Sequence, residues 1–191
     1  MRDVIRYGLV LGLICIVAAG ILAYVNEVTH SRIEAQKVIE EERALASALP
    51  DAATFKDETG AISDLLAQPQ FSLIKGFYEG YSTSDQRVGA AIKFSSPGYS
   101  GDIEGIVGIT NDGKISGVVI LSQQETPGLG ANVTTEGFRK RFLGKDVHSS
   151  IKLKKDGGDI DALTGATISS RAVARAVDAA GKLFGRLAAG R

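Results

Sequence analysis

An uncharged apolar run near the amino terminus limits what this chain can fold into. From Tyr7 to Val25 the sequence reads YGLVLGLICIVAAGILAYV, without an acidic or basic residue. As an α-helix the run would be roughly 28 Å long, which matches the hydrocarbon thickness of a bilayer. Tyr7 and Tyr24 stand near its two ends, where aromatic rings favour the headgroup region. The run predicts one transmembrane helix over residues 7–25, with Cys15 facing lipid or a packing neighbour.

A cleaved signal peptide is the alternative interpretation of this run. A retained anchor is favoured because the run is longer than the apolar core of a usual signal and no convincing A-x-A cleavage site follows it. Orientation is less sharply determined by the sequence. Arg2 and Arg6 lie close to the run on its amino-terminal side. On the carboxyl-terminal side the first basic residue is Arg32, and two further basic residues follow it before Pro50. Proximity favours a cytoplasmic segment 1–6 and an external carboxyl-terminal domain.

The segment after the anchor has the composition of a helix. Residues 26–50 are rich in Glu, Ala, Arg and Ile, lack glycine, and end at Pro50, which stops a helix. We expect a helical stalk here. Its partial apolar face, which predicts docking on the following domain, consists of Val38, Ile39, Leu45 and Leu49. Residues 51–191 are then long enough for one domain with its own core.

Strand signals begin near Val88. Three segments, 88–94, 103–110 and 115–121, are rich in β-branched residues with a period of two. Asn111-Asp112-Gly113 separates the second from the third and suits a tight hairpin. These segments predict an antiparallel sheet.

Two helices are expected after the strands. Residues 136–143 predict a short amphipathic helix that ends at Gly144. Residues 169–187 carry the clearest helical periodicity, with an apolar stripe formed by Val173, Val177, Ala180, Phe184 and Leu187. The expected fold class is therefore α+β: one transmembrane helix, then a domain with an antiparallel sheet and packed helices.

Composition excludes several kinds of function. The 22 basic and 22 acidic residues balance, which argues against a nucleic-acid partner. The single cysteine, Cys15, excludes an intramolecular disulfide and an iron–sulfur cluster ligated by this chain alone. His30 and His148 lack metal-ligand spacing, so no metal site is expected. Any redox centre carried by this chain must be an organic cofactor.

The segment before the last predicted helix has the properties of a phosphate site. Gly165 and Ala166 remove side-chain bulk, so that a ligand can approach the backbone. The first amides of the helix carry partial positive charge, which favours a phosphate. Thr167 places a hydroxyl at this point. On spacing alone, an equally good interpretation is that one of the nearby hydroxyls, such as Thr164 or Ser169, only caps the helix.

The string Asp161-Ala162-Leu163-Thr164-Gly165-Ala166-Thr167 resembles the flavinylation motif of the FMN-binding domains of Rnf complexes and sodium-pumping quinone reductases. The resemblance implies that Thr167 carries FMN as a phosphoester, attached by a flavin transferase that uses FAD and recognises Asp161. It also implies that Thr164, Gly165 and Ala166 surround the cofactor. Ala162 stands where the family often has glycine.

A second string, Glu125-Thr126-Pro127-Gly128-Leu129-Gly130, resembles the family's ETPGLG loop, which lies against the flavin ring. The resemblance implies that Leu129 packs on the ring and that Glu125 and Thr126 add polar contacts. Residues 98–101, Gly-Tyr-Ser-Gly, resemble a glycine-rich family segment less specifically. Lys155 is a candidate for neutralising flavin or phosphate charge, although its run is more often a solvated turn.

The compact length makes the chain similar to the G subunits of Rnf complexes. The resemblance implies an electron-transfer subunit, with covalent FMN, of a bacterial or archaeal plasma-membrane complex. Such complexes pass electrons between ferredoxin and NAD and translocate sodium ions or protons, and the isolated subunit is expected to turn over no substrate. Two alternatives remain: a stand-alone anchored FMN protein serving an extracytoplasmic reductase or sensor, and an anchored binding module without redox activity.

Overall fold

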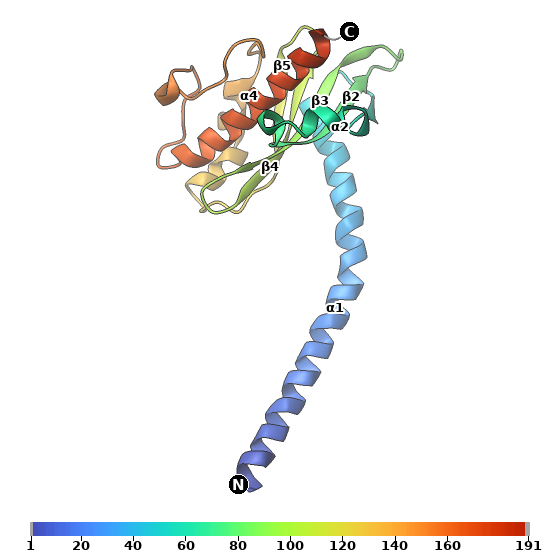
Figure 1. The fold of residues 1–191 in the computed structure, drawn as a ribbon, viewed down its shortest axis with the longest axis vertical. Helices are drawn as coiled ribbons and strands as arrows, with labels where there is room; N and C mark the ends of the chain where they lie inside the picture. The colour runs from blue at the N-terminus through green and yellow to red at the C-terminus, as the bar shows by residue number, and fades with distance from the viewer. Residues whose placement is uncertain (1, 190–191) are drawn as a thin grey trace. The chain divides into compact units, whose positions relative to one another are not determined.

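A computed structural model describes residues 2–189, which fall into two compact units that meet between Glu41 and Glu42. Helix α1, Arg2–Ala48, contributes to both (Figure 1). Among the described residues it is the one helix long and apolar enough to cross a membrane. Its large apolar side chains from Val4 to Val25 are exposed, as an anchor requires. The helix ends two residues before Pro50, where the sequence predicted a stop.

The second unit is built on one five-stranded sheet. All neighbours pair antiparallel, and the strands lie in the order in which they occur along the chain. The predicted α+β class is confirmed, and the three predicted strands are present as β3, β4 and β5. The strands are β1 (Thr54–Asp57), β2 (Ile74–Tyr81), β3 (Arg87–Pro97), β4 (Asp102–Thr110) and β5 (Ile115–Ser122).

Strands β1 and β2 were not predicted. Strand β1 has only four residues, none of them buried, so it carries little alternation. Strand β2 contains Gly76 and Gly80, which weaken a strand pattern. Packing requires the second glycine, because a Cβ on Gly80 would lie 2.5 Å from Leu49 Cδ2.

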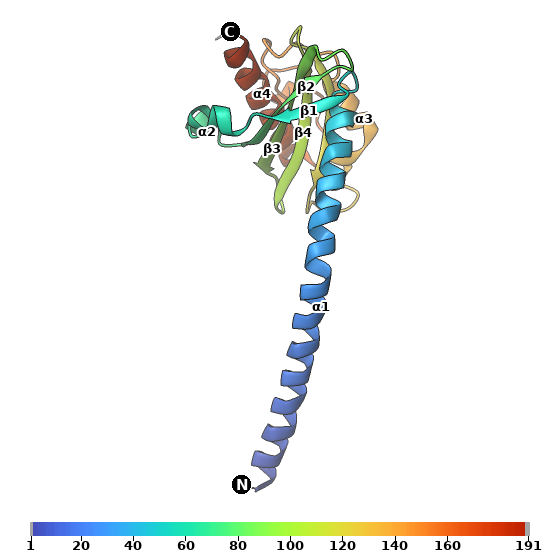
Figure 2. The ribbon, with the colours of Figure 1, turned by 90° about the vertical axis from the view of Figure 1, so that its right-hand side faces the viewer.

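The two faces of the sheet pack against different helices. Alternating residues such as Ile92, Phe94 and Val107 join the main core beneath α4, Thr167–Ala189. Ala91 and Ile106 point to the opposite face and contact the end of α1. Figure 2 shows α4 on one face of the sheet and the last turns of α1 on the other.

Helix α4 confirms the helix predicted over residues 169–187 and extends it by two residues at each end. The predicted helix at 136–143 is instead two short pieces before Gly144, which has φ +72°. The remaining helical elements of the described chain are short. They are η1 (Gly60–Ile62), α2 (Ser63–Leu66), η2 (Pro69–Phe71), η3 (Gly130–Thr134), α3 (Glu136–Arg139), η4 (Lys140–Phe142) and η5 (Lys154–Asp156).

The end of α1 is part of the folded domain. Leu45 and Leu49 are 5% and 0% exposed, whereas Val38 and Ile39, from the same predicted apolar face, are 59% and 49% exposed. The second compact unit accordingly starts at Glu42, earlier than the expected boundary at residue 51. The expected stalk is divided at this point: its last turns belong to the core of the domain.

Candidate functional site

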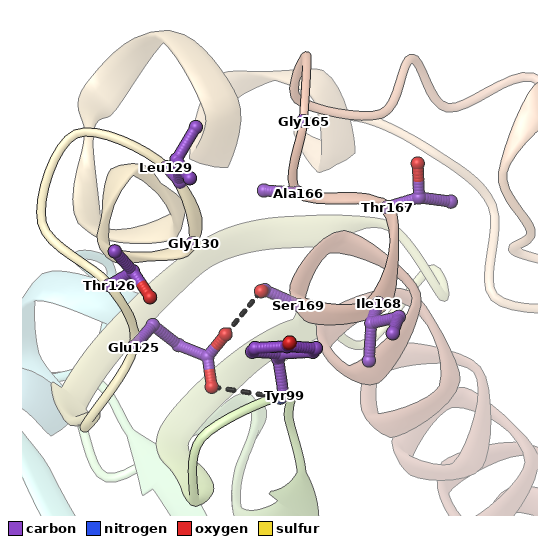
Figure 3. A pocket seen from close by; sticks show the side chains of 10 residues that line it. All are labelled: Tyr99, Glu125, Thr126, Leu129, Gly130, Gly165, Ala166, Thr167, Ile168 and Ser169. Carbon is purple, nitrogen blue, oxygen red and sulfur yellow. Dashed lines mark hydrogen bonds between the residues drawn. The ribbon is translucent and has the colours of Figure 1, made fainter.

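Three segments that lie far apart in the sequence surround one pocket. They are the turn between β3 and β4, the loop after β5, and the start of α4 (Figure 3). The pocket has a volume of about 550 Å³, within the range of small-molecule sites. It is lined by Tyr99, Glu125, Thr126, Leu129, Gly130, Gly165, Ala166, Thr167, Ile168 and Ser169. The two strings that the sequence analysis singled out thus lie face to face.

Thr167 is the first residue of α4 and stands at the rim of this pocket (Figure 3). It is half-buried, and within the described part of the chain its hydroxyl has no hydrogen-bond partner. The turn before it depends on Gly165, which has φ +73°. A Cβ on Gly165 would also lie 3.1 Å from Leu129 Cδ2. The glycine therefore keeps open the space between the two predicted motifs.

The serines after Thr167 are already engaged. The Ser170 hydroxyl donates to the carbonyl of Ala166 at 2.8 Å and accepts the Leu163 N–H at 3.0 Å. The Ser169 hydroxyl donates to Glu125 Oε2. Ser170 thus stabilises the turn that enters α4, whereas the Thr167 hydroxyl at the pocket rim bonds to none of the described residues.

The loop after β5 presents an apolar side chain on a tight turn. Gly128 has φ +78°, and the N–H groups of Leu129 and Ala131 both donate to the carbonyl of Thr126. Asn132 Nδ2 donates to the carbonyl of Gly128 at 3.0 Å. Leu129 is thereby held 45% exposed at the pocket.

Exposed apolar surface gathers around the same pocket. Tyr99 is 72% exposed and Ile168 47% exposed, and both line it together with Leu129. Large exposed apolar side chains that converge on one cavity are typical of a ligand-binding site.

Glu125 lies on the inner wall of the pocket and is only 5% exposed. Its Oε1 accepts the N–H groups of Tyr99 and Ser100, both at 2.9 Å. Burial alone would raise the pKa of Glu125, but hydrogen bonds from Ser169 and from the amides of Ser100, Tyr99 and Gly101 outweigh it and lower the pKa. Glu125 is therefore a buried, ionised carboxylate.

The other predicted site residues lie outside the pocket lining. Thr164 is exposed on the preceding turn. Asp161 is exposed and pairs with Lys154 at 2.8 Å, a hydrogen bond that lowers the pKa of Asp161. Its carbonyl accepts Arg141 Nη1 at 2.6 Å. Lys155 is exposed on η5, and the structure does not bring it to the pocket.

Sequence reasoning did not single out Tyr99, Ile168 or Ser169 as site residues. Tyr99 belongs to the Gly-Tyr-Ser-Gly segment, which is the turn between β3 and β4 and is closed by Gly98 N–H donating to the Gly101 carbonyl. Only the hairpin geometry brings this turn to Glu125. By sequence Ser169 is a candidate helix cap, and nothing local identifies Glu125 as its partner.

Comparison with known proteins agrees with this geometry. Residues 98–182 match the family described as FMN-binding domain, and residues 1–47 match the RnfG N-terminal region. The first match contains every residue that lines the pocket.

Two relatives extend over almost the whole chain, and each is named as the G subunit of an ion-translocating oxidoreductase complex. The protein from Methanosarcina acetivorans is 32% identical, with 94% of this chain and 93% of that protein covered. The protein of the same name from Shewanella piezotolerans is 35% identical, with 96% and 90% covered.

Among solved structures, NqrC of Shewanella oneidensis has a similar fold, with a TM-score of 0.50 at 23% identity over 61% of each chain. The fold likeness is consistent with the relationship that the sequences establish. On the identity and coverage of its relatives, the chain belongs to the family of G subunits of ion-translocating oxidoreductase complexes.

Proposed function

We propose that this chain carries FMN as a phosphoester on Thr167 and relays electrons within a membrane-bound Rnf complex. The observation that carries the proposal is the position of Thr167, whose hydroxyl has no hydrogen-bond partner in the described structure and stands at the rim of an apolar pocket. The family match to an FMN-binding domain covers that pocket and supports the choice of cofactor.

The residues present fit such a group. The first turn of α4 offers backbone N–H groups and the positive end of a helix dipole to a phosphate. Tyr99, Leu129 and Ile168 offer apolar surface to a flat ring. Gly165 leaves between them the space that a Cβ would fill. When bound, FMN supplies the redox chemistry, and the protein's part is to hold and orient it.

The attachment step is a phosphoryl transfer in maturation. A flavin transferase moves the FMN moiety of FAD to Thr167: the bond from Thr167 Oγ to phosphorus forms, the pyrophosphate bond of FAD breaks, and AMP leaves with the hydroxyl proton. Asp161, exposed on the turn before α4, is accessible for recognition by that enzyme. Once tethered, the cofactor cannot be lost by dilution, which suits a domain on the outer face of the membrane.

At the level of the complex, we propose that the assembly passes electrons between ferredoxin and NAD and couples this to the translocation of sodium ions or protons. The relatives' names include an ion-translocating oxidoreductase complex, which supports assembly with other Rnf subunits. The chain's own contribution is electron relay through its pocket, between redox centres of neighbouring subunits.

The test is to produce the chain together with a flavin transferase and to measure its intact mass. The wild-type chain should gain the mass of FMN less one water, and Thr167→Ala should lose both that mass and in-gel flavin fluorescence. Thr164→Ala is the matched control, since Thr164 is an exposed threonine on the same turn but outside the pocket lining. A wild-type chain without the added mass would refute the flavin assignment, and retained fluorescence in Thr167→Ala would move the attachment point.

A further inference from the structure

The carboxylate of Glu125 joins the segments that form the pocket. It receives the amide N–H groups of Tyr99 and Ser100 from one loop and the hydroxyl of Ser169 from α4. Ser169 is 44 positions away in the sequence. An ionised carboxylate accepts about four hydrogen bonds, so these three donors occupy most of its capacity.

Two glycines permit this arrangement. A Cβ on Gly98 would lie 2.6 Å from Glu125 Oε1, and a Cβ on Gly130 would lie 2.5 Å from both Glu125 Oε2 and Ser169 Oγ. Any side chain at Gly130 would therefore enter the space between the two bonded oxygens. The backbone at these glycines leaves room for the hydrogen bond between Glu125 and Ser169. The bond is buried: Glu125 is 5% exposed and Ser169 is 2% exposed.

The same contact links the start of α4 to the two loops that face it. Within residues 2–189, the bond from Ser169 to Glu125 is the hydrogen bond that connects the first turn of α4 with the loops at 98–101 and 125–130. In Figure 3 this bond crosses below the pocket, between the loop that bears Leu129 and the helix that bears Thr167.

We propose that Glu125 and Ser169 are a positioning pair that sets where a flavin ring tethered to Thr167 comes to rest. This inference depends on the proposed attachment at Thr167. A phosphoester fixes only one end of a flexible ribityl chain, so the tether alone leaves the ring free to sample many positions. The ring-facing side chains, Tyr99 and Leu129, belong to loops that the Glu125 carboxylate holds against α4. The pair therefore acts through these loops: their apolar side chains contact the ring, and Glu125 and Ser169 hold the loops in position.

The geometry distinguishes the effects of four substitutions. Ser169→Ala removes the link and leaves one carboxylate oxygen without its donor. Gly130→Ala separates the two oxygens while keeping both. Glu125→Gln should preserve the arrangement, because its amide oxygen can accept the loop N–H groups while its NH₂ donates to Ser169 Oγ. Gly137→Ala is the matched glycine control, since its Cβ would meet nothing within 4 Å.

The experiment uses the full chain, produced with a flavin transferase and purified in detergent. For each variant, the visible circular dichroism and the fluorescence anisotropy of the flavin are normalised to the attached fraction from intact mass. Ser169→Ala and Gly130→Ala should lose most of the induced dichroism and show a more mobile flavin. Gly137→Ala and Glu125→Gln should match the wild-type chain. All measurements are made at a temperature where every variant is folded. If the pair only stabilised the fold, Ser169→Ala and Gly130→Ala would lower the unfolding midpoint but would keep the ordered flavin ring at that temperature.

Hydrogen exchange provides a second readout that needs no flavin. The amides of Tyr99 and Ser100 should exchange faster in Ser169→Ala than in the wild-type chain, since their acceptor is no longer fixed. Wild-type ring order together with wild-type exchange at these amides in Ser169→Ala would overturn the positioning pair. A wild-type chain that never acquires the FMN mass would instead refute the proposed function. The exchange measurement would then still test whether the hydrogen bond between Glu125 and Ser169 orders the amides of Tyr99 and Ser100.

Discussion

Thr167 and Ser169 are two hydroxyl residues on one turn of a helix, yet their surroundings differ because successive positions on a helix face different directions. Ser169 points inward, is 2% exposed, and donates to Glu125. Thr167 is half-buried at the rim of the pocket and bonds to no described residue. Residue type alone makes either one a candidate for attachment or for a cap. The helical phase turns Ser169 toward Glu125 and places Thr167 at the rim of the pocket.

The lowered pKa of Glu125 gives a prediction about acid stability. The folded protein binds the Glu125 proton less tightly than the unfolded chain, so the ionised carboxylate stabilises the fold. This contribution is complete above the ordinary glutamate pKa of about 4.3 and disappears as the pH falls through the lowered value. The wild-type chain should therefore exceed Glu125→Gln in unfolding free energy by a constant amount at neutral pH, with the gap narrowing below about pH 4.

Urea unfolding in detergent at a series of pH values measures this gap. Glu136→Gln is the surface comparison: the pKa of Glu136 is also lowered, by a hydrogen bond to Lys140, so its gap should narrow in the same direction but be smaller, because water screens this exposed pair. A gap between wild type and Glu125→Gln that stays the same at every pH would show that folding does not shift the pKa of Glu125, and a gap that widens as the pH falls would show that folding raises it.

At the scale of elements, the end of α1 lies unusually close to the sheet. A Cβ on Gly108 would lie 2.0 Å from the Ala48 carbonyl oxygen, and one on Gly117 would lie 2.6 Å from it. The same carbonyl accepts the Ser116 hydroxyl at 2.7 Å. Carbonyls in the last turn of a helix lack partners within the helix, so Ser116 supplies one. Two glycines and a serine on neighbouring strands thus form the docking site for the last turn of α1.

Gly108→Ala should lower the free energy of unfolding, because the added methyl group must displace the last turn of α1 from the sheet. Overpacking of this kind costs about 1–3 kcal/mol. Thermal unfolding followed by far-ultraviolet circular dichroism measures the loss. Gly60→Ala is the control, since a Cβ there meets nothing within 4 Å. Equal midpoints for the two variants would mean that α1 does not dock as described.

At the scale of the whole molecule, the folded domain includes the carboxyl-terminal turns of α1. Ala44, Leu45 and Ala48 form a cluster with Ala91 and Ile106 on the face of the sheet opposite α4. Without these turns, that face would expose a contiguous apolar surface, which promotes association.

A chain that begins at Glu42 should therefore be soluble and unfold cooperatively, whereas one that begins at Asp51 should aggregate or unfold at a lower temperature. Size-exclusion chromatography and a thermal melt of the two truncated chains provide the comparison. Equal stability would show that the α1 turns contribute nothing to the domain and would restore the boundary expected from the sequence.

The proposed topology is tested by cysteine labelling in whole cells. With Cys15→Ala as background, Ser150→Cys places a thiol at an exposed position of the domain, and Asp3→Cys places one before the anchor. A membrane-impermeant maleimide should label the first in intact cells and the second only after permeabilisation. The reverse pattern would place the domain in the cytoplasm.

Elements with strong local signals could be predicted from the amino-acid sequence. The uncharged run of bilayer length predicts a helix that could cross a membrane. Helix α1 contains this run and is long and apolar enough to do so. Segments rich in β-branched residues predict strands β3 and β4, which are buried on both faces, and the apolar stripe predicts α4. The resemblance of two strings to a known family also predicted the family to which the chain belongs. This was possible because each motif is a continuous stretch of sequence.

Contacts between residues that are distant in the sequence depend on how the chain folds. Strands β1 and β2 carry weak local patterns and form because a neighbouring strand offers them an edge. The structure, not the spacing, brings Tyr99 and Ser169 to Glu125 and leaves Lys155 outside the pocket lining. The partners of a buried carboxylate lie on other elements, and only chain folding sets the distances between elements. The sequence predicts Thr167 as a site residue, and the fold places it at the rim of a pocket whose other walls come from distant segments of the chain.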